Sequence, residues 1–242
     1  MLSSAAGNDL LFDTNLCDQG KSFSNKVWNS FRLVNGWEIS DIEQPDYCYN
    51  SIIWYKHKFN DVLNRVNDHF SKFRISDALM SIYRLIWDDF CSVLLEIIKP
   101  EYGKPIDSMT YKEVIKIFEN NLLILHPFMP FITEEIWHLI AERSADEAIV
   151  ISEWPQSENN INNDIINNFE NLQNIISGIR NLRKKHQISF KKGVELSVVN
   201  NDNFTKNYDS IISKLCNVNN IRYKDSEIKN ALTLSLIHIS EP

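Results

Sequence analysis

Aromatic and basic residues are interleaved in the segment Trp54-Tyr55-Lys56-His57-Lys58. These residue types could bind single-stranded RNA, because aromatic rings stack on exposed bases while cations contact phosphates. The side of an ordinary amphipathic helix has the same pattern, and the pattern alone slightly favours that interpretation. If the segment does bind RNA, we expect Trp54 to stack on a base and Lys56 and Lys58 to contact phosphates or base edges.

A second candidate surface lies near the N-terminus, where a helix is predicted from Asp13 to about Val34, before Gly36. Four polar residues share one face of this helix. The pattern favours a solvated face and an RNA contact about equally. The four residues are Asn25, Lys26, Asn29 and Arg32.

The clearest basic patch follows a run of helically spaced isoleucines in the second half of the chain. It closes a predicted helix, and its cations could follow an RNA backbone. The residues concerned are Arg180, Arg183, Lys184 and Lys185, with Lys191 and Lys192 just beyond.

Catalytic patterns are largely missing from the sequence. It contains no GxGxxG, GxxxxGK[ST], HExxH or GxSxG motif. The acid pairs Asp88-Asp89 and Glu134-Glu135 are adjacent on predicted helices, so their carboxylates diverge rather than converge on one bond. Glu134 and His138 share a helix face, but no third ligand is nearby and no metal site is expected. We therefore expect no catalytic residues and a binding function.

Composition sets broad limits on the class of protein. The chain has 242 residues, of which 43% are hydrophobic and 24% charged, enough for a large core. Four scattered cysteines indicate neither zinc nor disulfides, which favours the cytoplasm. No apolar run reaches the roughly 18 residues of a membrane helix. A net charge of −7 argues against indiscriminate nucleic-acid binding, so no DNA partner is expected.

Apolar periodicity predicts a mainly α fold, an antiparallel helical bundle followed by a small α/β segment. The expected bundle helices span about 13–34, 49–73, 76–98, 110–125 and 133–143. A strand-like run at Ile149-Val150-Ile151 follows, and then a linker around Trp154. We place the bundle at residues 1–155.

The bundle contains a corner with the sequence LLILHPFMPFITEEIW, from Leu122 to Trp137. Its two prolines, Pro127 and Pro130, cannot both lie inside a helix, so one helix should end and another restart at Thr133. We expect the apolar residues of the corner, Phe131 among them, to pack where helices meet.

Residues 156–234 are predicted to form a helix and a small α/β segment. A strand at 194–199, a helix at about 204–216 and a strand near 221–223 give a βαβ-like order. Residues 235–242 fit neither pattern, and we interpret them as a non-native tail.

Four motifs in order resemble the C-terminal half of class I aminoacyl-tRNA synthetases of the valine, isoleucine and leucine subgroup. They are LSSAAGNDLLFD at 2–13, NKVWNSFR at 25–32, WDDFCSVLLEIIKP at 87–100 and LHPFMPFITEEIW at 125–137. The sequences of these motifs are most similar to those of the valine-specific branch. The segment 176–199 extends the resemblance over nearly the whole chain. An isoleucine- or leucine-specific member, a stand-alone helical RNA-binding module and a purely structural scaffold remain alternatives.

The resemblance implies an anticodon-binding bundle whose partner is valine-specific tRNA, and it raises Trp54 from a surface aromatic to the expected stacking residue. It also implies a parent enzyme, monomeric and cytoplasmic, that uses ATP with magnesium to join valine to its tRNA. The nucleotide-binding motifs of the family have no match here, so we expect this chain to lack the catalytic half and a C-terminal coiled coil, to bind no cofactor, and to be inactive alone. Met1 would then be an internal residue of the parent.

Overall fold

The computed structural model describes residues 14–144, 146–158, 161–199 and 206–224. The chain divides into two compact units, Met1–Ile161 and Asn162–Pro242. The motif at 2–13, the predicted helix starts at Asp13 and Phe204, and the tail at 235–242 lie outside the described residues. No helix among the described residues is long and apolar enough to cross a membrane.

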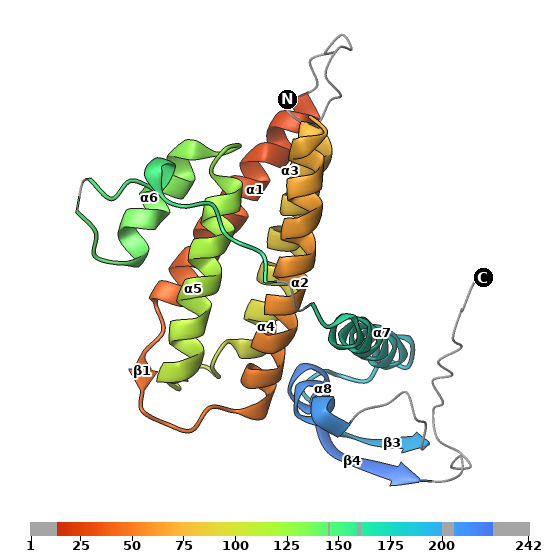
Figure 1. The fold of residues 1–242 in the computed structure, drawn as a ribbon. Helices are drawn as coiled ribbons and strands as arrows, with labels where there is room; N and C mark the ends of the chain where they lie inside the picture. Colours follow the sequence, from red (N-terminus) through yellow and green to blue (C-terminus); the bar gives the residue numbers. More distant parts are fainter. Residues whose placement is uncertain (1–13, 145, 159–160, 200–205, 225–242) are drawn as a thin grey trace. The chain divides into compact units, whose positions relative to one another are not determined.

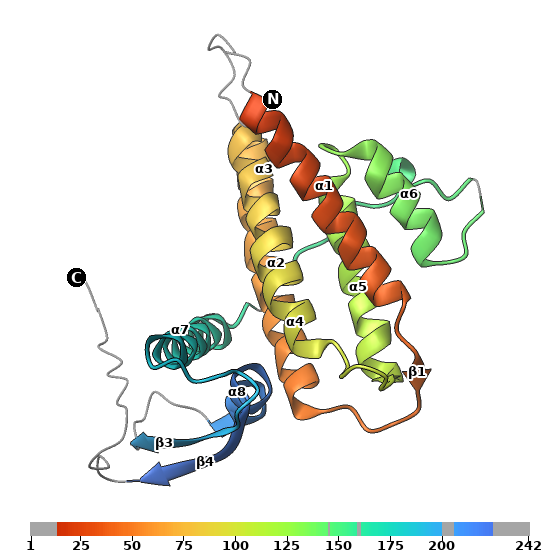
Figure 2. The same ribbon diagram turned by 180° about the vertical axis from the view of Figure 1, so that it is seen from behind.

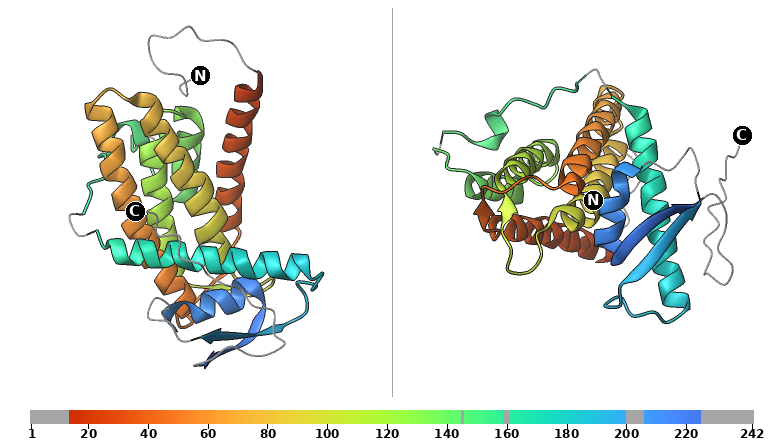
Figure 3. Two further views of the ribbon diagram at one scale, coloured as in Figure 1. Left: turned by 90° about the vertical axis from the view of Figure 1, so that its right-hand side faces the viewer. Right: turned by 90° about the horizontal axis from the view of Figure 1, so that it is seen from below.

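The first unit is an antiparallel helical bundle, which confirms the predicted fold class (Figures 1 and 2). Four long helical segments lie side by side, and the shorter α6 packs beside α1 and α5 (Figure 3). The helices are α1 Thr14–Asn35, α2 Asp46–Ser71, α3 Ile75–Arg84, α4 Leu95–Ile98, α5 Ser108–Leu125 and α6 Pro130–Ile140.

The segment between α3 and α4 is a π-helix, Leu85–Leu94, so that residues 75–98 form one continuous helical rod. Its turns are wider than those of an α-helix, and π-helical turns are rare and frequently found at functional sites. The rod carries many of the fully buried residues, Ile82, Leu85, Leu94 and Ile97 among them. The helix predicted at about 76–98 is confirmed, but the change of helical period inside it was not predicted.

A two-residue parallel pairing ties the loops at one end of the bundle. Strand β1, Ile39–Ser40, pairs with β2, Ile106–Asp107. The buried carboxylate of Asp107 then accepts a hydrogen bond of 2.7 Å from the backbone N–H of Thr110. This bond caps α5 and fixes its first turn, because the first amides of a helix have no partner within the helix.

The proline corner was predicted correctly as a helix break, but α6 begins at Pro130 rather than Thr133. Proline suits the first helical turn because its missing N–H needs no partner there. Thr133 is fully buried, and its hydroxyl donates to the carbonyl of Met129 at 2.9 Å and lies 2.8 Å from Nδ1 of His126. The packing prediction was wrong for Phe131, which is 90% exposed.

The strand predicted at residues 149–151 is wrong. Ile149–Ile151 is a short 3-10 helix, η2, and no strand of the described residues pairs with it. The backbone N–H of Ile149 instead donates to the Glu134 carboxylate on α6 at 3.1 Å. The apolar run reflects the burial of Ile149 alone, since Val150 and Ile151 are exposed.

The second unit has the predicted strand–helix–strand order. Helix α7, Asn163–Lys185, is capped by the side chain of Asn162 and is followed by β3 Val194–Val199, a short 3-10 helix η3 Lys206–Tyr208, α8 Asp209–Cys216 and β4 Val218–Lys224. The two strands pair in parallel. Phe169, Ile211 and Ile212 are fully buried in its core.

Candidate nucleic-acid interface

The structure contradicts the stacking role predicted for Trp54. Its side chain is 1% exposed and lies edge-on against Tyr55, with ring centroids 5.9 Å apart. Ser51, Trp54 and Tyr55 are all buried, so α2 is covered over a wide arc by its neighbours. A base cannot reach the ring of Trp54 in this conformation, and the side chain belongs to the core.

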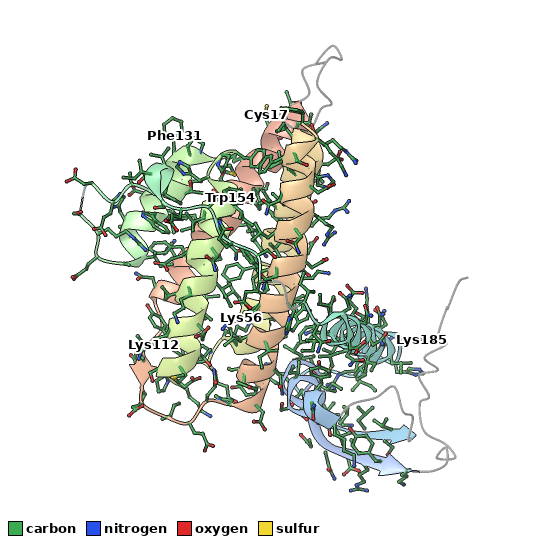
Figure 4. The ribbon with its side chains drawn as sticks, viewed as in Figure 1. Cys17, Lys56, Lys112, Phe131, Trp154 and Lys185 are labelled. Atoms are coloured by element: carbon green, nitrogen blue, oxygen red, sulfur yellow. The ribbon has the colours of Figure 1, made fainter. Side chains whose placement is uncertain are left out.

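Lys56 and Lys58 lie on the same helix with different surroundings. Lys56 forms an ion pair with Glu113 of α5, and this lysine holds the pKa of the Glu113 carboxyl below its usual value. Figure 4 labels Lys56 between α2 and α5. A phosphate would have to compete with Glu113 for Lys56. Lys58 is partly exposed.

The polar face of α1 is accessible, as predicted. Asn25, Asn29 and Arg32 are exposed and lie four and three residues apart, which places them in one stripe along the helix. Lys26 is half-buried beside this stripe. Its amino group lies 5.4 Å from the centroid of the Trp87 ring, within the range of a cation–π interaction.

Two aromatic residues next to this stripe were missed in the sequence. Tyr83 and Trp87 are half-buried and stack on each other, with ring centroids 5.6 Å apart and an angle of 14° between the planes. The buried ring of Phe23 on α1 supports both, at 4.7 Å from Tyr83 and 6.2 Å from Trp87. We call Lys26, Tyr83 and Trp87 the aromatic platform.

The π-helix helps to position this platform. Tyr83 lies in the last α-helical turn of α3, and Trp87 lies in the first π-helical turn. Ser92 donates a side-chain hydrogen bond of 2.8 Å to the carbonyl of Trp87, five residues earlier. The sequence signal was an aromatic pair at i, i+4, which also fits a packed helix face, so the pattern alone could not single it out.

The chemistry of the aromatic platform is that of binding. It offers ring faces and a cation, and α1 also carries exposed side-chain amides; these are the groups that contact unpaired nucleotides. Burial and the nearby Asp88 raise the pKa of Tyr83, so its hydroxyl remains a neutral donor near pH 7. Among the described residues, no group of three or more His, Cys, Asp or Glu could hold a metal ion.

Glu134 and His138 serve a structural contact. One carboxylate oxygen of Glu134 lies 3.1 Å from His138 Nε2 and accepts from the N–H of Ile149. Together these bonds attach the segment after α6 back onto the helix.

The basic residues at the end of α7 differ in exposure: three are exposed and one is buried. Arg180, Lys184 and Lys185 are exposed, and Figure 4 shows Lys185 at the end of the helix. Arg180 also donates to the carbonyl of Leu215 at 3.2 Å. The predicted phosphate contact at Arg183 is wrong for this conformation, because its side chain is 5% exposed and donates to backbone carbonyls.

Comparison with known proteins shows similarity over most of the chain. Residues 53–199 match the family model described as "Anticodon-binding domain of tRNA ligase". Curated relatives named valine--tRNA ligase are similar over most of the chain: 52% identity in Christiangramia forsetii, over 96% of this chain and 27% of the relative. The relative from Phocaeicola vulgatus is 45% identical over 91% of this chain and 25% of its own length. The relative from Pseudothermotoga lettingae is 30% identical over 80% of this chain and 22% of its own length. The chain thus spans about a quarter of the length of these relatives. By the match over residues 53–199, the chain belongs to the family of anticodon-binding domains of tRNA ligases.

Proposed function

We propose that this chain is the part of a valine--tRNA ligase that holds the anticodon stem-loop of valine-specific tRNA. The family match supports binding of tRNA, and the names of the relatives favour valine over isoleucine and leucine. The parent enzyme would be monomeric and cytoplasmic and would bind no DNA. It would join valine to its tRNA in a catalytic part outside these residues, using ATP and magnesium there.

The observation that carries the proposal is the aromatic platform. A half-buried Trp87 ring, stacked on Tyr83 and close to the Lys26 ammonium, offers an apolar face that the bundle does not fully cover. Unpaired bases in a loop are bound by stacking on such rings, and their edges are read by neighbouring polar groups. Asn25 and Asn29, exposed along α1, supply amides for that reading. Arg32 on the same stripe, together with Lys56 and Lys58 on α2, remains a candidate for phosphate contact.

The proposal is tested by measuring the affinity of the complete chain for valine-specific tRNA. Loss of one stacked base costs about 1–3 kcal/mol, so Trp87→Ala should weaken binding roughly tenfold. Tyr102→Ala is the matched control, because Tyr102 is a fully exposed aromatic in a loop of the same unit. Trp87→Leu retains apolar bulk beside Phe23 and separates loss of stacking from loss of folding.

Specificity is tested with three tRNAs. Valine-specific tRNA should bind more tightly than isoleucine- or leucine-specific tRNA, and exchange of its anticodon should remove the preference. Equal affinity for all three would favour a general RNA-binding module. Failure to bind any tRNA would refute the proposed function.

A further inference from the structure

The loop between α7 and β3, residues 186–193, is held from within by the buried Arg183. One terminal nitrogen of its guanidinium donates to the carbonyl of Cys216 at 3.1 Å. The other donates to the carbonyls of Ser189 and Lys192, both at 2.6 Å. Because an arginine stays charged in proteins, a buried one needs such acceptors, and here two of the three belong to the loop.

A second side chain, at the C-terminal end of α8, also fixes the loop. Asn217 follows α8 with φ of +50°, a left-handed conformation that asparagine tolerates. Its side-chain amide donates to the carbonyl of Phe190 at 2.8 Å. The carbonyls of Ser189, Phe190 and Lys192 are therefore each bound by a side chain from outside the loop, which predicts a rigid backbone rather than a flexible connection.

This rigid loop presents an aromatic ring among cations. The side chain of Phe190 is 54% exposed, and Lys191 and Lys192 beside it are exposed as well. The Arg183 guanidinium lies 5.4 Å from the centroid of the Phe190 ring. The fixed loop and the Arg183 guanidinium hold the exposed part of this ring in one position, where it can accept a stacked group without first being ordered.

The charge around the ring indicates what that occupant is. Between Glu170 and Glu195 the sequence has six lysines and arginines and no aspartate or glutamate, although the whole chain carries a net charge of −7. A ring that offers its face, surrounded by cations, suits a polyanion with unpaired bases. An acidic protein would also be attracted by these lysines, but it would not provide the planar bases that stack on the exposed ring.

We infer that the Phe190 loop is a second RNA-binding site, separate in sequence from the aromatic platform, which takes an unpaired nucleotide of the bound tRNA. The base stacks on Phe190, and Lys191 and Lys192 contact the phosphates on either side. Arg183 is a positioning residue that holds the loop backbone and touches no RNA. This inference rests on the proposed function in taking tRNA as the natural ligand.

The test uses the complete chain and two probes, valine-specific tRNA and an unstructured oligouridylate. Phe190→Ala should weaken binding of both about fivefold or more, the lower end of the range for one stacked base. Phe131→Ala is the matched control, because Phe131 is an exposed phenylalanine of the first unit.

The phosphate contacts are tested by salt dependence. The double variant Lys191→Gln/Lys192→Gln should reduce the slope of log affinity against log salt by about 1.4 for the oligouridylate, at roughly 0.7 for each phosphate contact to a single strand. The control is Lys112→Gln/Lys116→Gln, two exposed lysines on α5, which should leave the slope unchanged.

The role of Arg183 is tested by coupling. In an Arg183→Gln background that keeps its helical content, Phe190→Ala should no longer change RNA affinity, because the ring has lost its fixed position. Additive effects of the two substitutions would contradict positioning, since a merely structural arginine would lower affinity independently of Phe190.

The outcomes for the two sites can be told apart. If Trp87→Ala weakens tRNA binding while the Phe190 and lysine variants bind both probes like wild type, the inference falls and the proposed function stands. If the chain shows no preference for valine-specific tRNA but Phe190→Ala still weakens binding of the oligouridylate, the second site stands without that function. Absence of binding to either probe overturns the inference.

Discussion

Tyr55→Phe removes one hydroxyl from the centre of the helical unit. That hydroxyl donates to Oδ1 of Asn121 at 2.9 Å, joining α2 to α5. Both residues are buried, at 0% and 2% exposure. The amide nitrogen of Asn121 has no hydrogen-bond partner among the described residues, so the Tyr55 hydroxyl is its one side-chain link there.

The expected cost follows from the burial of both partners. A buried acceptor that loses its donor costs about 1–3 kcal/mol, so Tyr55→Phe should lower the free energy of unfolding by that amount. Asn121→Leu leaves the Tyr55 hydroxyl unpaired, but it also removes the unpaired amide nitrogen, so its cost should be smaller. A leucine suits the site because Phe90, Phe118 and Leu122 line a small cavity beside Asn121.

The double variant is the sharper test. With both polar partners replaced by apolar groups of similar shape, the change should be close to neutral. The sum of the two single costs should then exceed the cost of the double variant by about 1–3 kcal/mol, at least the cost of Tyr55→Phe alone, as for residues in direct contact.

Urea denaturation followed by tryptophan fluorescence measures these energies. All six tryptophans lie at or before Trp154, within the first unit, so the signal reports the bundle without the second unit. Tyr49→Phe, at an exposed tyrosine of α2, is the control and should stay within about 0.5 kcal/mol of wild type. Additive single costs, or a Tyr55→Phe cost no larger than the control, would refute the reasoning.

Two further predictions concern the same core. Trp54→Ala should cost about 3–5 kcal/mol of stability, because it empties a large buried site, and RNA affinity per folded molecule should not change; a variant as stable as wild type in urea denaturation would contradict the burial. Burial raises the pKa of Tyr55 well above its usual value and that of Tyr47 to about 12, so the folded state holds these protons more tightly than the unfolded state. The contribution of these two tyrosines to the free energy of unfolding is complete below about pH 10, the ordinary tyrosine pKa. It is lost as the pH rises through their pKa values in the folded state. As the pH rises above about 10, the free energy of unfolding should therefore fall less steeply for Tyr55→Phe than for wild type. Parallel curves of unfolding free energy against pH would contradict this prediction.

Local sequence determined the secondary structure of both units well. Apolar residues spaced three or four apart predicted the long helices, and alternating apolar and polar residues predicted β3. Both periods can be read from the sequence without knowledge of the tertiary structure. Prolines marked the break before α6, since proline removes a backbone donor wherever it occurs. The run Ile149–Ile151 misled the prediction because three β-branched residues favour a strand only where another strand is available to pair with.

The binding surfaces were decided by tertiary structure. In sequence, Trp54 followed by cations is a better stacking candidate than Trp87, yet packing buries Trp54 and leaves Trp87 beside Lys26, a residue far away in the chain. Arg183 and Lys184 are neighbours in one basic run, but their side chains lie about 100° apart around α7, so one is buried under the loop and the other is in water. The sequence by itself determined which residue types are present and which local elements form. Exposure depends on which other segments cover each helix face, and that is known only once the helices have packed.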